Sequence, residues 1–409
     1  MDTSFFKGFI DTTFRDGQQS PLLFDTYKYR FNLEDKKLLM EGLVRLGIKH
    51  FEFFSPIVSE IEKSDFLKLK QHISTFSKKK LMYIAHCRVM EKDVEEALQA
   101  GFNGLNLYIG ASKYAQNFSH NNSLNEIKNK ALVLVKSLRK KYPNLYMRFS
   151  VEDTFRTALK DVFSIYDMLY PYINTFGMPD TVGEATPDVV DKTVRALKKR
   201  YPLVDLECHF HNDRGLSIIN ALTAVKAGAS YIDTSIWGLA ERSGITSTTG
   251  LLLNLIHEDP LLEKKYNISI SYPINIIMAS ILKMQVPYTE PVSLTNRTHT
   301  AGVHQKAILR NTKVYEAHSL DRFGVTKNQV LLGPLSGWNL IHYFLREVQG
   351  FEITKEQAQE ISFLFKAQAP RLTKKFKPEE LLKSIILQYK LRQTTIPIDL
   401  DMKRVENFN

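Results

Sequence analysis

Two histidines separated by one residue lie in the segment ECHFHND, residues 207–213. On a β-strand, residues i and i+2 point to the same face, so His209 and His211 project together while Phe210 points the other way. Two neighbouring imidazoles can hold a metal ion, and they can equally form an ordinary hydrogen-bonded pair. The motif by itself leaves both interpretations open.

A second group of reactive side chains follows an apolar stretch near the N-terminus, in the segment TTFRDGQQS. It places Arg15, Asp16 and Gln19 just beyond a predicted strand. Asp16 taken alone is typical of a surface carboxylate. Together with two imidazoles it would leave positions open for substrate and water on a six-coordinate divalent ion. Magnesium, manganese, zinc and cobalt all fit such a set, and the sequence does not choose among them.

Arginine and hydroxyl side chains form a third group. In MRFSVED, Arg148, Ser150 and Glu152 alternate onto one face of a predicted strand, and Thr181 follows the next strand in MPDTVG. Arginine forks bind carboxylates in a bidentate manner, so Arg15 and Arg148 together indicate a substrate with two carboxylates. The alternative is that Arg148 pairs with Glu152 in a network that only stabilises the fold.

A repeated strand-and-helix pattern must position these groups. The strand candidates are residues 9–14, 49–54, 81–86, 105–110, 146–151, 174–178, 205–210 and 230–235. Between them lie stretches with apolar residues at helical spacing, among them 33–47, 91–101 and 216–228. Eight successive units predict an α/β protein built on a closed (β/α)8 TIM barrel. Chemistry in such barrels lies at the C-terminal ends of the strands, which would bring Asp16 and the histidine pair to one rim.

The alternation stops after about residue 260, and the rest of the chain is predicted to be mainly helical. We expect a catalytic barrel at 1–260, a linker and lid subdomain at 261–320, and a helical C-terminal subdomain at 321–409. The polar stretch 295–316 lacks the periodicity of a core-forming element. By itself it is typical of an exposed linker.

Composition places the chain among globular proteins, with 44% hydrophobic and 24% charged residues. No apolar run approaches the roughly 18 to 20 residues that span a bilayer, and the N-terminus lacks a signal-peptide pattern. The two cysteines, Cys87 and Cys208, have neither C-x-x-C nor zinc-ribbon spacing and are expected to be buried reduced thiols. The net charge of +11 comes from lysines and arginines scattered over separate helix ends. We therefore expect a soluble, cytoplasmic protein with no nucleic-acid and no membrane partner.

Taken together, these motifs resemble those of the DRE-TIM metallolyase superfamily. DTTFRDGQQSP, HFHND and GLAERSGIT carry this resemblance. AGVHQKAI with VYE resembles the Claisen-condensing branch, which joins acetyl-CoA to a 2-oxo acid. Within that branch the motifs resemble homocitrate synthase most, with 2-isopropylmalate synthase a related pattern. The resemblance covers nearly the whole chain.

The resemblance implies a role for each matching position. The implied metal ligands are Asp16, His209 and His211, the implied catalytic residues are Glu152, His304 and Tyr315, and the implied substrate-binding residues are Arg15, Gln19, Glu52, His86, Arg148, Ser150 and Thr181. His304 and Tyr315 would reach the site from the neighbouring subunit of a domain-swapped homodimer, so the resemblance implies that the stretch 295–316 is a lid over the barrel of a partner subunit. Which catalytic residue acts as the general base stays open.

Several positions depart from the homocitrate synthase pattern. Gln18 stands where glutamate is usual, Phe54 where threonine is usual, and Asp16 is one methylene shorter than the usual ligand. Ile84 takes the place of a histidine, while His86 lies two residues further on the same strand face. His86 either substitutes for that histidine or is a satisfied histidine of the barrel wall.

The predicted function is therefore a metal-dependent condensation of acetyl-CoA with a 2-oxo acid, first of all 2-oxoglutarate, which gives homocitrate and CoA for lysine biosynthesis. The alternatives are a 2-isopropylmalate, citramalate or Re-type citrate synthase, a lyase or aldolase on the same barrel, and a degenerate paralogue without activity. Relatives that resemble HMG-CoA lyase carry a catalytic cysteine after strand eight, and WGLAERSGIT has none.

Overall fold

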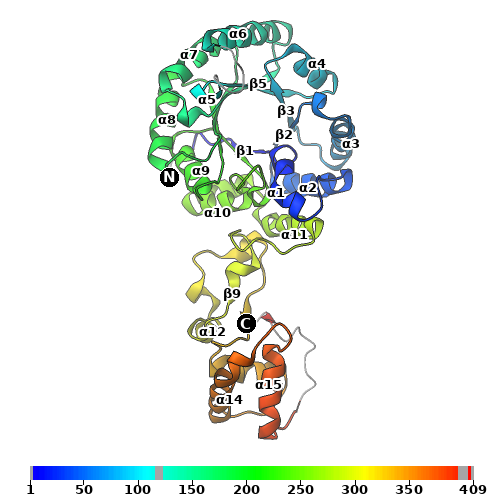
Figure 1. Cartoon of the computed structure of the whole chain (residues 1–409), viewed down its shortest axis with the longest axis vertical. Coiled ribbons are helices and arrows are strands. Elements are labelled where there is room, and N and C mark those ends of the chain that lie inside the picture. Colours follow the sequence, from blue (N-terminus) through cyan, green and yellow to red (C-terminus); the bar gives the residue numbers. More distant parts are fainter. Residues whose placement is uncertain (1–2, 116–122, 395–403, 407–409) are drawn as a thin grey trace. The chain divides into compact units, whose positions relative to one another are not determined.

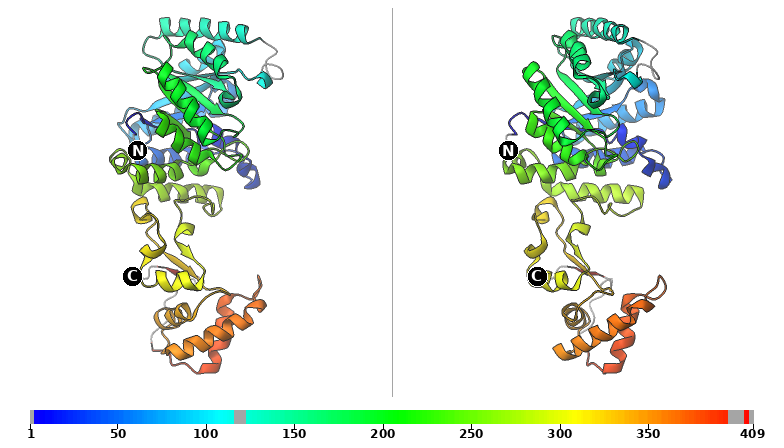
Figure 2. Two further views of the ribbon diagram at one scale, coloured as in Figure 1. Left: turned by 90° about the vertical axis from the view of Figure 1, so that its left-hand side faces the viewer. Right: turned by 60° about the vertical axis from the view of Figure 1, so that its left-hand side comes forward.

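The computed structural model describes residues 3–115, 123–394 and 404–406. The chain divides into two compact units, Met1–Pro291 and Val292–Asn409, and each is described by itself (Figures 1 and 2). Within the described ranges, no helix combines the length and the apolar character needed to cross a membrane.

The first unit is a closed barrel of eight parallel strands in sequential order (Figure 1). The strands are β1 (Gly8–Asp11), β2 (His50–Phe54), β3 (Met82–Arg88), β4 (Gly104–Gly110), β5 (Tyr146–Glu152), β6 (Thr175–Asp180), β7 (Asp205–Phe210) and β8 (Tyr231–Thr234). β8 pairs with β1 over four residues and closes the barrel. The predicted fold class is confirmed, and every predicted strand overlaps an observed one.

Helices follow the strands and surround the barrel (Figure 1). They are α1 (Pro21–Asp25), α2 (Leu33–Leu46), α3 (Glu60–Phe76), α4 (Glu91–Gln99), α5 (Lys113–Ala115), α6 (Leu124–Lys141), α7 (Leu159–Leu169), α8 (Pro187–Arg200), α9 (Ser217–Ala227), α10 (Thr248–Glu258) and α11 (Ser271–Leu282). Local sequence sets their ends. In α2, Asn32 and Asp35 form a capping box, and Gly47 ends the helix with a φ of 116°.

An apolar layer inside the barrel supports the polar residues above it. Ile10, Ile84 and Tyr231 pack together in this layer, and all three are buried. Ile84 precedes His86 by two residues and therefore shares its strand face. The isoleucine that stands where the homocitrate synthase pattern has a histidine is thus part of the barrel core.

The first unit continues beyond residue 260 because α11 packs against α2. Gly42 of α2 permits this close approach, since a Cβ atom there would lie 2.9 Å from Ile274 Cγ1. Ile274 is buried in the contact. The barrel unit accordingly ends at Pro291, later than the boundary expected from the end of the alternating pattern.

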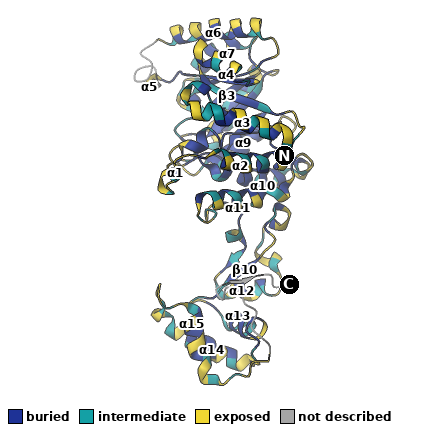
Figure 3. Cartoon of the chain, turned by 90° about the vertical axis from the view of Figure 1, so that its right-hand side faces the viewer, coloured by how far each residue is buried: buried dark blue, intermediate teal, exposed yellow. Residues whose placement is uncertain are grey.

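The second unit combines a small sheet with helices. Its elements are β9 (Thr298–His299), β10 (Gln329–Leu331), β11 (Arg404–Glu406), α12 (Gly302–Ile308), α13 (Trp338–Tyr343), α14 (Lys355–Gln368) and α15 (Pro378–Ile386). Ile308, Leu340, Ile361 and Leu382 belong to one buried core (Figure 3). Residues on both sides of the expected boundary at 320 therefore share that core.

Candidate active site

A cavity of about 200 Å³ opens among the side chains that end the barrel strands. It is lined by Arg15, Asp16, Gln19, His86, Asn106, Tyr108, Arg148, Ser150, Glu152, Pro179, Thr181, Glu207, His209, His211, Asp233, Glu241 and Arg242. The barrel thus gathers nearly all the site residues that the sequence predicted within its first 260 positions. Glu52 lies in contact with this group but does not line the cavity. Phe54 does not line it either.

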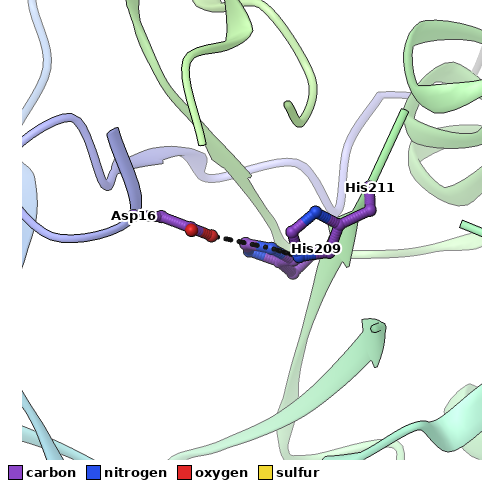
Figure 4. A group of neighbouring side chains, drawn as sticks. All are labelled: Asp16, His209 and His211. Atoms are coloured by element: carbon purple, nitrogen blue, oxygen red, sulfur yellow. Dashed lines mark hydrogen bonds and ion pairs between the residues drawn. The ribbon is translucent and has the colours of Figure 1, made fainter. Parts of the chain in front are cut away.

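Three buried side chains converge at the cavity wall: Asp16 of the 3-10 helix η1 (Asp16–Gln19), His209 at the end of β7, and His211 just beyond it (Figure 4). His209 Nε2 lies 3.3 Å from both Asp16 Oδ2 and His211 Nε2. Donor atoms that share one ion at about 2.1 Å have similar separations. Asp16 Oδ2 is also buried without a hydrogen bond in the described part of the chain. The donor set and its spacing fit a divalent metal ion.

Asp233 of β8 orients the central ligand. Its Oδ2 lies 3.2 Å from His209 Nδ1, so that nitrogen donates to the carboxylate and Nε2 faces Asp16 and His211. Burial disfavours a charged imidazole, but contacts with Asp16 and Asp233 outweigh burial and raise the pKa of His209 to about 9. Burial and the neighbouring His209 cation lower the pKa of His211 to about 3.

Metal binding is expected to displace the proton from His209 Nε2. Because the pKa of His209 is raised to about 9, the ring is protonated below that pH and competes with the ion. The apparent Kd for Mn²⁺ should therefore fall about tenfold per pH unit from neutral pH up to the pKa, and then level off. Titration calorimetry in buffers of different ionisation enthalpy measures the released proton. A Kd that is constant across this range would contradict the assignment.

Glu52 of β2 links the two arginines of the site. Its Oε1 accepts a hydrogen bond from Arg15 Nε at 3.0 Å, and its Oε2 accepts one from Arg148 Nη2. Burial alone would raise the pKa of Glu52, but Arg148 and Arg15 hold it well below its usual range. The side chain is therefore a buried anion that fixes both guanidinium groups.

Three carboxylates surround Arg148 of β5. Its Nη1 lies 2.8 Å from Asp233 Oδ1 and 3.5 Å from Glu207 Oε2, and Glu52 supplies the third contact. Burial disfavours the cation, but Asp233, Glu207 and Glu52 raise the pKa of Arg148 well above its usual value. Burial raises the pKa of Glu207 well above its usual range in spite of Arg148. These contacts hold the guanidinium at the base of the cavity.

Asn106 of β4 arranges the next part of the wall. Its Oδ1 accepts a hydrogen bond from Ser150 Oγ at 2.8 Å, and its Nδ2 donates to Glu52 Oε2 at 3.0 Å. The same Nδ2 lies 3.0 Å from Nδ1 of His86, whose ring stacks on Tyr108 with centroids 4.3 Å apart. His86 is therefore both well partnered and a lining residue of the cavity.

The loops after β5, β6, β7 and β8 are joined at the cavity rim. Thr181 Oγ1 accepts a hydrogen bond from the Asp153 amide at 2.9 Å, and the Thr181 carbonyl accepts one from Arg242 Nη2 at 2.6 Å. Arg242 Nε also donates to Asp213 at 2.9 Å. The turn at Gly244 requires glycine, because its φ is 87° and a Cβ atom would lie 2.2 Å from the Gly238 carbonyl. These contacts hold the rim around the three ligands.

Known protein families and curated proteins match the sequence of this chain. Residues 8–274 match the family model described as HMGL-like, and residues 292–372 match the one described as homocitrate synthase post-HMGL domain-like. The cytosolic homocitrate synthase isozyme of Saccharomyces cerevisiae is 33% identical over 361 residues, which cover 86% of this chain and 80% of that protein. The chain belongs to the HMGL-like family. It is a homocitrate synthase-like acyltransferase of the Claisen-condensing type.

Other relatives of this HMGL-like protein are more distant. A 2-isopropylmalate synthase of Bacillus pumilus is 27% identical, with 97% of this chain and 76% of that protein covered. A hydroxymethylglutaryl-CoA lyase structure from Pseudomonas aeruginosa has a TM-score of 0.57 at 17% identity, covers 69% of this chain and 94% of that one, and shows the shared fold alone. Cytosolic and mitochondrial isozymes from one yeast both match, so cytoplasmic location stays a prediction.

His304 and Tyr315 lie in the post-HMGL unit, in α12 and in the 3-10 helix η9 (Thr312–Tyr315). Their rings stack with centroids 4.0 Å apart, and His299 lies about 6 Å from each. The predicted pair is therefore brought together within its own unit. Its contribution to the active site of a neighbouring subunit stays a prediction.

Sequence reasoning missed several polar residues that line this HMGL-like site, among them Asn106, Glu207 and Asp233. Each is buried and lies on a barrel strand. Two signals could have found them. Glu207 precedes His209 by two positions and shares its strand face, and the polar residue in YIDT interrupts an apolar strand. Because buried charged groups require partners, Glu207 and Asp233 could have been predicted as partners of the arginines in the site.

Proposed function

We propose that this chain condenses acetyl-CoA with 2-oxoglutarate to give homocitrate and CoA. The observation that supports this choice of 2-oxo acid is the polarity of the cavity. Apart from Pro179, the residues lining it in the described part of the chain are charged, amide, hydroxyl or imidazole side chains. A branched aliphatic substrate would meet no leucine, isoleucine, valine or methionine side chain among these lining residues, whereas a second carboxylate would meet hydrogen-bond donors.

Binding of the 2-oxo acid is assigned to the arginines and hydroxyl groups of the cavity. Arg15 and Thr181 would hold the carboxylate beside the keto group, and Arg148 with Ser150 would bind the distal carboxylate. Gln19 and His86 would complete the wall, and Glu52 would act through the two arginines that it holds. A divalent ion held by Asp16, His209 and His211 would supply Lewis-acid polarisation of the keto group.

The chemistry requires one proton abstraction, one new carbon–carbon bond and one hydrolysis. A base of the protein removes a proton from the acetyl methyl group, and the resulting enolate attacks the keto carbon of the 2-oxo acid. Water then cleaves the thioester, releasing CoA and the new carboxylate. Glu152 lines the cavity, which supports its proposed role as a residue that would accept or donate a proton.

His304 and Tyr315 are proposed to serve the same proton transfers from the partner subunit of a domain-swapped homodimer. The 4.0 Å stacking of their rings supports a joint role, because it keeps an imidazole and a phenol side by side. Mixing two inactive variants, Glu152→Gln and His304→Ala, would test this arrangement. Recovered activity in mixed dimers would support shared sites, and none would contradict them.

CoA release across a panel of 2-oxo acids tests the proposed substrate. Purified protein with Mn²⁺ or Zn²⁺ and acetyl-CoA is expected to release free thiol with 2-oxoglutarate at a kcat/KM at least about tenfold above that for glyoxylate, pyruvate, oxaloacetate or 2-oxoisovalerate. Mass spectrometry identifies the product. Preference for 2-oxoisovalerate would refute the argument from polarity, and no release with any acid would refute the proposed reaction.

A further inference from the structure

The single turn that carries Asp16 presents two different faces. It is the 3-10 helix η1, and side chains three residues apart in such a helix lie one above the other. Asp16 and Gln19 both line the cavity. Gln18 lies between them in sequence, is absent from the lining, and is buried at 8% exposure. The turn therefore needs an anchor on its second face, and Gln18 is the side chain placed to provide it.

Gln18 uses both ends of its amide. Its Nε2 donates to the Phe14 carbonyl and to Glu62 Oε2, each at 3.0 Å. Its Oε1 accepts a hydrogen bond from the Phe31 amide at 3.2 Å. One side chain thus joins η1 to the segment that leads into α2 and to a carboxylate of α3. A carboxylate at this position could not make the same contacts, because it has no hydrogen to donate.

Lys36 of α2 fixes the carboxylate that Gln18 contacts. Its Nζ lies 2.8 Å from both oxygens of Glu62 and 2.9 Å from Asp65 Oδ2. Lys36 is 2% exposed, and Arg30 Nη1 lies 3.3 Å from the same Asp65 oxygen. Two cations therefore face two anions, and this balance leaves no counterion for a further negative charge.

We propose that Gln18, Glu62 and Lys36 form a brace that positions the metal ligand Asp16, with Gln18 and Lys36 buried and Glu62 partly exposed. The brace holds η1 against α2 and α3, and so fixes the Asp16 carboxylate relative to the imidazoles of His209 and His211 beside it. It explains why an amide stands at position 18. Glutamate there would lie within about 3 Å of the partly buried Glu62 carboxylate, and two like charges this close repel each other. The inference rests on the metal site of the proposed function and is independent of the 2-oxo acid.

A charge swap tests the brace. Gln18→Glu is expected to raise the Kd for Mn²⁺ about tenfold, since lost support of a ligand typically costs that much affinity. It should also change the visible absorption spectrum of bound Co²⁺, which reports ligand geometry. Adding Glu62→Gln returns one amide and one carboxylate to the pair but does not restore the hydrogen bond to the Phe14 carbonyl, so it should recover part of the lost affinity and give a Kd clearly below that of Gln18→Glu. Glu60→Gln, the same charge change at an exposed position of α3, is the matched control and should leave both readouts unchanged.

The outcomes separate the brace from general stability and from the proposed reaction. Gln18→Met removes the same hydrogen bonds without adding a charge, so it serves if Gln18→Glu does not fold, and it should also raise the Kd about tenfold. A folded Gln18 variant with unchanged Kd and Co²⁺ spectrum would overturn the proposal, as would a double variant that stays as weak as Gln18→Glu. All measurements are made without substrate. Wild-type protein that binds metal but releases no CoA would refute only the proposed reaction.

Discussion

His211→Ala is expected to weaken Mn²⁺ binding strongly and to lower kcat/KM for CoA release by about a thousandfold, equivalent to about 4 kcal/mol of transition-state stabilisation. His211 offers the cleanest test among the three ligands. Its Nδ1 makes no hydrogen bond within the described residues, so its removal takes away a ligand and little else. His209, in contrast, also holds Asp233. Metal content by mass spectrometry and CoA release by thiol assay measure the effect.

The control for this prediction is a histidine outside the cavity. His72 lies on α3 and contacts Glu41 Oε1 at 2.7 Å, so His72→Ala removes an imidazole without touching the metal group. It should keep its metal content and its activity within about twofold of wild type. Full activity of a metal-depleted His211→Ala protein would show that the three-residue group is not the metal site.

Arg148→Met is expected to lower the free energy of unfolding by about 3–5 kcal/mol, the typical result of removing one partner of a buried ion pair. Methionine fills similar space but leaves Glu52 and Asp233 facing each other without the cation between them. In the wild-type protein, Arg148 helps to hold the pKa of Glu52 well below its usual range. Without it only Arg15, among the two arginines that contact Glu52, offsets the burial that raises this pKa, so the loss should be largest above the ordinary carboxyl pKa and shrink as the pH falls towards it. Urea unfolding at several pH values measures the change.

Arg195→Met provides the matched control for Arg148→Met. Arg195 pairs with Asp191 on the exposed face of α8. Breaking such an exposed pair should lower the free energy of unfolding by no more than about 1 kcal/mol. If Arg148→Met lowered the free energy of unfolding by only this amount, water or a shifted side chain would have to stabilise the buried carboxylates of the variant in place of Arg148. The prediction also bears on substrate assignment. An Arg148 variant can turn over more slowly simply because its fold is less stable. That cause must be excluded before the slower turnover is taken as evidence that Arg148 contacts the distal carboxylate.

Most of the barrel could be predicted from sequence because its signals are local. Strand periodicity, helical spacing and glycine caps act within a few residues, so stretches such as 205–210 and 33–47 identify themselves. The closed eight-strand order followed from counting these units. The end of the first unit did not, because it depends on α11 packing beside Gly42, a contact between segments far apart in the chain.

The metal group could also be predicted, since a strand end fixes where a side chain must lie. Asp16, His209 and His211 each end a strand or follow one, and strand ends share one rim of a barrel. The roles of His304 and Tyr315 came from the resemblance alone. Their rings stack within the second unit. Their proposed contribution to the active site of a partner subunit therefore stays untested.

The sequence by itself determined the elements, the strand faces and the set of side chains at the rim. Only the tertiary structure decided which charges are partners. Sequence offered Glu152 for Arg148, four residues away, whereas the structure surrounds Arg148 with Glu52, Glu207 and Asp233. Periodicity fixes the face on which a side chain lies, but a contact across the barrel depends on the register and closure of all eight strands. Buried charges then take the partners that this closure brings within reach.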